Sequence, residues 1–193
     1  MTDTGEITDG RVARGQERRA EIARAVIDVV AEHGLRGLTH RKVAEAAGVP
    51  LGSTTYHFET LDDLMMAGLE LAAERNLAMM RRAAERLDAG GDIAGWLTEL
   101  MIEMVTTWRE SNIAERELYL EAIRNPALRP AATRWDDAFV DILEPHLGDR
   151  EGARLACWAL DGLAVTLLIA GSPPDRDRIL RQMDRLCADL GTA

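Results

Sequence analysis

Apolar side chains recur at helical spacing along most of this 193-residue chain, and short polar segments separate the apolar runs. Within residues 16–33, for example, Ile22, Val26, Val29 and Val30 fall on one face of a helix. No window shows the alternation of β-branched and polar residues that is typical of a strand. The pattern predicts an all-α protein of about nine helices.

The segment from Leu38 to Leu64 predicts two short helices joined by a tight turn. Thr39 is a good N-cap for the first helix, because its hydroxyl can accept a bond from a free backbone amide. Gly48 can take the left-handed conformation that such a turn requires, and Pro50 suits the start of the next helix. Two short helices set at an angle are a common way to place one of them in the DNA major groove. The segment therefore predicts a helix-turn-helix DNA-binding domain.

Other polar positions divide the remaining chain. Thr60 and Asp63 approximate a capping box that would open a long fourth helix. Asp92, at the end of an expected loop over residues 89–92, would cap a fifth. We expect a disordered tail at residues 1–15, the helix-turn-helix domain at 16–60 and a second helical domain at 61–193.

The charge distribution changes the interpretation of an acidic total. The formal net charge is −10, but residues 59–193, with 15 basic and 25 acidic residues, carry all of it. Residues 11–58 hold 8 basic and 5 acidic residues, a balance of +3. A local positive field is what meets DNA phosphates, so the acidic total does not exclude DNA binding.

The composition favours a cytoplasmic protein that does not contact a membrane. The first ten residues are acidic and hold no apolar run, so neither a signal peptide nor an anchor is expected. The longest apolar stretch, residues 155–171, contains Asp161 and is shorter than the roughly 20 residues that span a bilayer. Cys157 and Cys187 lack metal-ligand spacing and are expected to be reduced, buried thiols. We expect no metal and no cofactor.

The helix-turn-helix segment resembles the signature of the TetR family of bacterial transcription regulators, over about residues 17–65. The positions that carry the resemblance are Thr39, Val43, Ala44, Ala47, Gly48, Val49, Gly52, Tyr56, His57 and Phe58. The resemblance implies an all-α homodimer in which three N-terminal helices bind double-stranded operator DNA. It implies that the remaining helices form a ligand-sensing and dimerising domain. Such proteins usually repress a nearby operon until a small molecule releases them.

Four positions depart from the usual pattern of the family. Thr54 stands where a buried leucine is common, and Thr55 where a phosphate-contacting tyrosine is common. Leu51 and Leu61 each replace a frequent lysine. These changes leave the expected DNA face with less positive charge and with shorter side chains.

We expect DNA contacts from the third helix and from the start of the second. Small polar side chains can read base edges, Gly52 allows close approach, and an amide-rich helix start can receive a phosphate. The expected DNA-binding residues are Thr39, His40, Arg41, Gly52, Ser53, Thr54, Thr55, Tyr56 and His57. Arginines in the N-terminal arm, at positions 11, 14, 18 and 19, are further candidates.

The second domain offers candidates for an unidentified small-molecule effector and for a dimer interface. The expected ligand-binding residues are aromatic, methionine and acidic side chains: Met104, Trp108, Tyr119, Trp135, Phe139 and Asp161. The expected interface uses apolar residues of the last two helices: Leu160, Leu163, Leu167, Ile179, Met183 and Leu186. Asp161 lies in an apolar run, where a lone buried carboxylate is costly. It is interpreted either as an ion-pair partner of an arginine or as a partner for a cationic or hydroxylated ligand.

Two other function classes stay open. An all-helical enzyme is disfavoured, because the chain shows no Gly-rich phosphate loop, no HExxH motif and no clustered Glu and His ligands. The second alternative is a helix-turn-helix protein that binds another protein and has lost DNA binding. The missing lysines favour this alternative over the enzyme.

Overall fold

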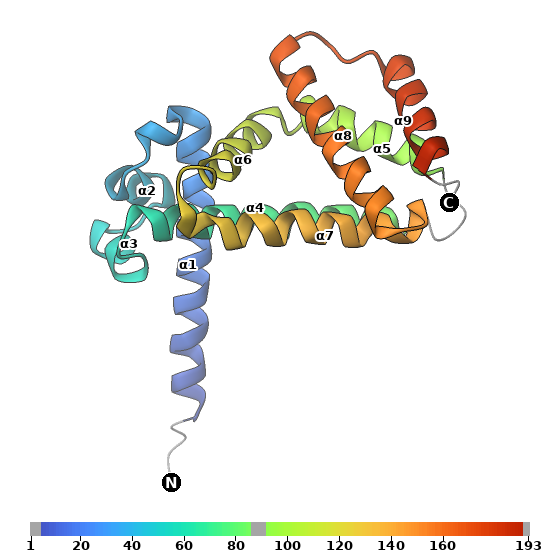
Figure 1. Ribbon diagram of the computed structural model, residues 1–193. Coiled ribbons are helices and arrows are strands. Elements are labelled where there is room, and N and C mark those ends of the chain that lie inside the picture. The colour runs from blue at the N-terminus through green and yellow to red at the C-terminus, as the bar shows by residue number, and fades with distance from the viewer. Residues whose placement is uncertain (1–4, 86–91, 191–193) are drawn as a thin grey trace. The chain divides into compact units, whose positions relative to one another are not determined.

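The computed structural model describes residues 5–85 and 92–190, and side chains within these ranges except those of residues 5–12 and 83. The described residues form α-helices and two short 3-10 helices, η1 (Leu35–Gly37) and η2 (Pro126–Leu128), without strands, which confirms the all-α prediction. The nine α-helices labelled in Figure 1 are α1 (Gly5–His33), α2 (His40–Ala47), α3 (Leu51–His57), α4 (Leu61–Ala84), α5 (Ile93–Val105), α6 (Arg109–Glu121), α7 (Arg129–Leu147), α8 (Arg150–Ala170) and α9 (Arg176–Leu190).

The chain forms two compact units. The first comprises residues 1–72 and 114–129, and the second comprises residues 73–113 and 130–193. This division differs from the expected boundary after residue 60, because the start of α4 and most of α6 pack with the N-terminal helices. A methyl group added at Gly68 of α4 would lie 2.8 Å from Val26 Cγ1 of α1 and 3.4 Å from Leu118 Cδ1 of α6.

The first helix starts much earlier than the sequence pattern suggested. α1 begins at Gly5, so the expected disordered tail at 1–15 is wrong from Gly5 onward, while residues 1–4 lie outside the described residues. The segment holds no proline, and its glycines at 10 and 15 reduce helix propensity without ending a helix. The apolar period that marks a helix starts only at Ile22, which explains why the earlier turns were missed.

The first unit has its core between α1 and the helices that follow. Ile22 and Val26 of α1, Val43 of α2, Phe58 after α3 and Leu64 of α4 are each at most 1% exposed. α2 packs against α1, and α3 packs against α2 (Figure 1). Burial of these side chains holds the two short helices in place, since helices of this length are not stable alone.

The turn between α2 and α3 has the predicted chemistry. The Thr39 hydroxyl accepts a hydrogen bond from the Lys42 backbone N–H at 3.2 Å. Gly48 takes the left-handed conformation with a φ of 64°, and its N–H donates to the carbonyls of Ala44 and Glu45. The local sequence therefore fixes both the start and the end of α2.

The capping box before α4 is also confirmed. The Asp63 carboxylate accepts from the Thr60 backbone N–H at 2.9 Å, and the Thr60 hydroxyl accepts from the Asp63 N–H at 3.1 Å. The Thr60 hydroxyl also donates to the Asp63 carboxylate at 2.9 Å. The bonds from the Thr60 N–H and hydroxyl to the carboxylate lower the pKa of Asp63 below its ordinary value, because they stabilise the charged form.

The second unit is a bundle in which α5 packs against α8 and α9, and α8 packs against α9. Its core contains Leu97 and Met101 of α5, Leu143 of α7, Leu160 of α8 and Ile179 of α9. Asp92 caps α5 as predicted, accepting from Ala94 N–H at 3.0 Å. Residues 89–91 of the expected loop lie outside the described residues.

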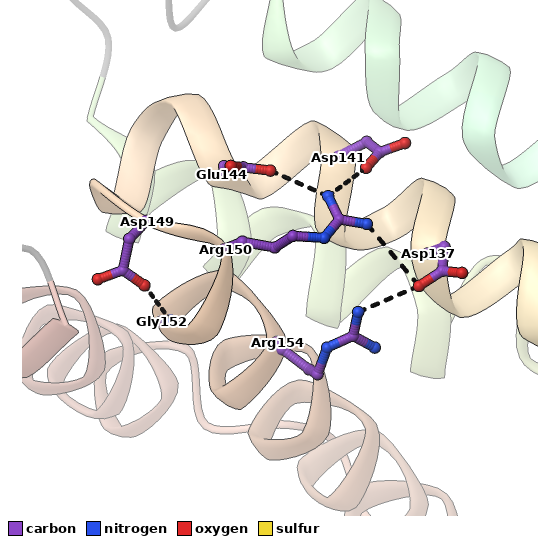
Figure 2. A network of polar contacts seen from close by, with 7 residues as sticks. All are labelled: Asp137, Asp141, Glu144, Asp149, Arg150, Gly152 and Arg154. Carbon is purple, nitrogen blue, oxygen red and sulfur yellow. Dashed lines mark hydrogen bonds and ion pairs between the residues drawn. The ribbon is translucent and has the colours of Figure 1, made fainter.

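An ion-pair network joins the end of α7 to the start of α8 (Figure 2). Arg150 contacts Asp141 at 2.6 Å and Glu144 at 3.0 Å, and Arg154 contacts Asp137 at 3.1 Å. The carboxylates raise the pKa of Arg150, mainly through the hydrogen bonds from its guanidinium to Asp141 and Glu144. The network therefore links α7 to the first turn of α8.

Candidate DNA interface and ligand-binding cluster

The third helix presents a mixed apolar and polar surface to solvent. Tyr56 is 84% exposed and Leu51 49% exposed, and Gly52 and Thr55 are exposed as well. Of the six predicted contacts on this helix, Gly52, Thr55 and Tyr56 are therefore exposed, and Ser53 and His57 are half-buried.

Thr54 does not belong to that face. Its side chain is fully buried, and its hydroxyl donates to the Leu51 carbonyl at 2.7 Å. The prediction that Thr54 contacts DNA is wrong, because the residue fills the core position where the family commonly has leucine. The neighbouring Thr55 is exposed, and its hydroxyl lies 3.3 Å from the Gly52 carbonyl.

Gly52 leaves open space on the outer side of α3. Apart from its chain neighbours and the adjacent helix backbone, no described atom lies within 4 Å of a methyl group built at this position. Packing within the chain therefore does not require a glycine here, although glycine weakens a helix. A close approach of another molecule would explain it.

The start of α2 has the features of a phosphate site. Thr39 and Arg41 are exposed, and the Arg41 guanidinium lies 3.5 Å from Glu45 on the same helix. Such an exposed ion pair is weak and leaves the guanidinium available. His40 is half-buried, and its Nδ1 is a buried atom without a hydrogen-bond partner among the described residues. Three neighbouring predicted residues are thus grouped at one helix start.

Arg19 of α1 has a structural role that the sequence did not show. Its guanidinium carbon lies 4.6 Å from the centre of the Phe58 ring, and its Nη1 donates to the His57 carbonyl at 3.4 Å. Arg14 and Arg18 are exposed, with Arg18 paired to Glu21 at 3.0 Å. Arg19 therefore fixes the end of α3, whereas the side chain of Arg11 lies outside the described residues.

The second unit contains a cluster rich in methionine and aromatic residues, in which half-buried side chains pack against the buried Met80, Leu100 and Ile142. It brings together three of the predicted ligand-binding residues, Met104, Trp108 and Phe139. Further members come from α4 and from α5, including Met79, Met80, Leu77 and Trp96. Methionine and aromatic side chains adapt to flat apolar ligands, so this is the candidate ligand-binding cluster.

The other three predicted ligand residues lie elsewhere. Trp135 is half-buried on α7 but is not a member of the cluster, and Tyr119 belongs to the first unit. Asp161 is exposed on α8. The inference from Asp161 assumed a buried carboxylate, and its exposure removes that argument for a ligand-binding role.

The predicted dimer-interface residues form the interior of the second unit. Leu160, Ile179 and Met183 are at most 3% exposed, and the other three residues, Leu163, Leu167 and Leu186, pack against the same core. The prediction is wrong for the buried three, since side chains inside one chain cannot present a face to a second copy.

The opposite face of α8 is apolar and exposed instead. Trp158 is 65% exposed and Ile169 81%, and Leu155 and Val165 are also exposed. With the exposed Gly162 they form what we call the α8 stripe: Leu155, Trp158, Gly162, Val165 and Ile169. Successive members are three or four residues apart, the spacing of one helix face in helix–helix packing. The sequence signal for this exposed face is that α8 carries apolar residues at the spacing of two different helix faces.

The two faces also explain the overall hydropathy of α8. Among the described residues, α8 is the helix whose length and composition would allow it to cross a bilayer, and 28% of its most apolar window is buried. Core helices of soluble proteins meet the same criterion. One face of α8 packs in the bundle, so the apolar composition has a structural reason.

Comparison with known proteins relates both units to regulators. A family model described as tetracyclin repressor-like, C-terminal domain, matches residues 91–189. An HTH-type transcriptional regulator of Haemophilus influenzae is 29% identical over 166 residues, which cover 83% of this chain and 78% of the relative. The multidrug binding protein EbrR, solved with ethidium, is 40% identical with a TM-score of 0.77, covering 88% of this chain and 98% of EbrR. The TetR-family member SCO1917 of Streptomyces coelicolor is 42% identical with the same TM-score and the same coverage.

Proposed function

The chain belongs to the TetR family of transcriptional regulators, and from this premise we propose that it represses transcription as a homodimer that a small molecule releases from its operator. The family consists of DNA-binding regulators and not of enzymes, in agreement with the expectation from sequence. The observation that carries the proposal is the presence of a helix-turn-helix with an exposed α3 in one unit and of a methionine-rich and aromatic cluster in the other.

DNA contact is assigned to the exposed residues of α3 and the start of α2. Ser53 and Thr55 have hydroxyls that can bond to base edges, and the Thr55 methyl can meet a thymine methyl. Thr39 and Arg41 are placed at a helix start, where backbone amides and positive charge favour a phosphate. Tyr56, at 84% exposure, is available for a phosphate and is not a core residue. Base contacts would select the sequence, and phosphate contacts would fix the register.

The homodimer is assigned to the α8 stripe. Large apolar side chains that stay exposed together on one helix usually mark an interaction site, and Trp158 and Ile169 are each more than half exposed. A two-fold dimer would carry two copies of α3 about one DNA turn apart. The operator is therefore expected to be a near-palindrome.

The effector is assigned to the class of cationic aromatic compounds. EbrR has been solved with ethidium, malachite green and proflavin, and it is about 40% identical to this chain. The cluster here contains Trp96, Trp108 and Phe139, whose rings can stack on an aromatic ligand and attract a cation. Residues 59–193 carry a net charge of −10, which also favours cations. Release requires that the ligand bind the weakly DNA-binding conformation more tightly than the other.

One experiment separates this proposal from its rivals. Ethidium fluorescence is titrated with the protein alone, and a gel shift measures binding to the DNA upstream of the chain's own gene, with competitor DNA. We expect saturable dye binding that Trp108→Ala weakens and the control Trp135→Ala does not, together with a specific DNA shift. Dye binding without any DNA shift would support the protein-interaction module instead, for which the exposed Leu51 and Leu61 are the favouring observation. The absence of both dye binding and a DNA shift would contradict the proposal.

A further inference from the structure

Packing among the described residues does not require the glycine in the middle of the α8 stripe. Gly162 is exposed, and apart from its chain neighbours and the adjacent helix backbone no described atom lies within 4 Å of a methyl group built on it. It sits eight residues before the last residue of a helix that runs to Ala170, so it neither ends a helix nor takes a positive φ. Glycine in a helix interior is unfavourable relative to alanine. Its presence therefore points to something outside the chain that needs the space.

The stripe around Gly162 is self-complementary. Leu155 lies seven residues before Gly162 and Ile169 seven residues after it, so an antiparallel second copy centred on Gly162 would place Leu155 against Ile169 of that copy. By the same symmetry, the large Trp158 would face the small Thr166 of the second copy. Stripe residues spaced by three and four are the arrangement that lets two helices pack at a shallow angle. A pair centred at the level of residue 160 would instead place Trp158 against Gly162 and Leu155 against Val165 of the second copy, so cross-linking at position 162 is needed to separate the two registers.

We infer that two copies of α8 cross at Gly162, with each glycine meeting its counterpart on the two-fold axis of the dimer. The inference rests on the proposed homodimer and adds the point and direction of the helix crossing. The missing side chain allows the two backbones to approach closely, as small residues do where helices cross. Trp158 and Val165 then cover the crossing on either side.

The substitution Gly162→Ala gives two effects of opposite sign. Alanine favours the helix, so the helical signal in circular dichroism should not fall and the single chain should fold at least as well. The added methyl groups meet each other at the crossing, so the dissociation constant of the dimer should rise by roughly tenfold or more. Gly15→Ala is the matched control, because Gly15 is also a helix-interior glycine with no described atom within 4 Å of the added methyl. It should leave the dissociation constant unchanged in analytical ultracentrifugation.

Cross-linking tests the symmetry directly. A residue on the two-fold axis meets its own counterpart, so Gly162→Cys should form a disulfide-linked dimer when an oxidant such as copper phenanthroline is added. Ala159→Cys, also exposed on α8, is off the axis in this arrangement and should not. The native cysteines should not interfere, because burial raises the pKa of Cys157 to about 12 and that of Cys187 to about 11.

The outcomes distinguish the crossing from the homodimer. Weaker association of Gly162→Ala together with cross-linking at position 162 supports the crossing. Dimerisation of Gly162→Ala at wild-type strength, with no cross-link at 162 but loss of the dimer in Trp158→Arg, overturns the crossing and retains the α8 interface. A wild-type protein that stays monomeric at all concentrations overturns the homodimer itself.

Discussion

The guanidinium of Arg19 lies over the ring of Phe58, 4.6 Å from its centre, and so connects α1 to the residue that ends α3. The same side chain donates to the His57 carbonyl at 3.4 Å. Phe58 is 1% exposed, so the ring is a fixed support. α3 therefore has a support at each end, the Gly48 turn before it and Arg19 after it.

Replacing Arg19 with alanine should loosen the end of α3. The cation–π contact is at an exposed site, so the free energy of unfolding should fall by about 0.5–1 kcal/mol. DNA affinity should fall as well, because α3 loses part of its positioning. Chemical unfolding and DNA titration measure the two effects. Arg18→Ala is the control, since Arg18 pairs with Glu21 on α1 itself; equal loss of stability in both variants would contradict the role of Arg19.

Arg41 should contribute affinity without sequence preference. Arg41→Ala should weaken binding to all DNA sequences alike and reduce the slope of log affinity against log salt by about 1, as expected for one lost phosphate contact. Titrations at several salt concentrations, on operator and unrelated DNA, measure both. Arg24→Ala removes another exposed charge, on α1, and should change neither. A loss confined to one base position would contradict the phosphate assignment.

Gly52 should show opposite effects on stability and on DNA binding. The added methyl in Gly52→Ala meets no described atom within 4 Å, so α3 should gain up to about 1 kcal/mol in the free energy of unfolding. DNA binding should weaken, because the methyl occupies the space that a base or phosphate approaches. Gly48→Ala is the contrasting variant. Its φ of 64° strains an alanine, so stability should fall by about 1 kcal/mol. Unchanged DNA affinity of Gly52→Ala would show that the open space is not used.

The capping box should make the start of α4 sensitive to acid. Asp63→Asn should lower the free energy of unfolding by about 0.3–1 kcal/mol at neutral pH, because the amide keeps an acceptor oxygen but removes the negative charge at the helix start. The folded-state pKa of Asp63 is lowered, so its stabilisation is present above the ordinary pKa of aspartate and is lost as the pH falls through the lowered value. The difference between wild type and Asp63→Asn should therefore shrink in acid. Glu59→Gln, outside the capping box, is the control; a difference that does not vary with pH would contradict the assignment.

The DNA-binding unit was largely predictable because its fold depends on local chemistry. Thr39, Gly48 and the pair Thr60 and Asp63 each perform the capping or turn role that their type and spacing indicate. Thr54 was the exception. The resemblance marks position 54 as one where a buried leucine is common, but the polar character of threonine favoured the surface. Its hydroxyl donates to the Leu51 carbonyl within α3, and this bond allows a polar residue to occupy the core position.

The second unit was less predictable because α8 is apolar on two faces. Leu160 and Trp158 are two residues apart, yet Leu160 is 3% exposed and Trp158 65%. Helical spacing identifies both faces equally well, and only the packing of α5 and α9 decides which one is the core. The same uncertainty placed Asp161 in an apolar interior, whereas the structure exposes it. The first and last residues of a helix are similarly difficult to predict from sequence, as the start of α1 at Gly5 shows.

The most direct test of the account is DNA release by a cationic aromatic compound. Fluorescence anisotropy would follow labelled DNA from upstream of the gene, bound by the protein, during titration with malachite green. Trp108→Ala, in parallel, corrects for dye that binds the DNA itself. The account predicts that the dye releases DNA from the wild-type protein at concentrations that leave the Trp108→Ala complex intact. Equal release from both proteins, or none from either, would contradict a ligand-responsive repressor that senses cationic aromatic compounds through this cluster.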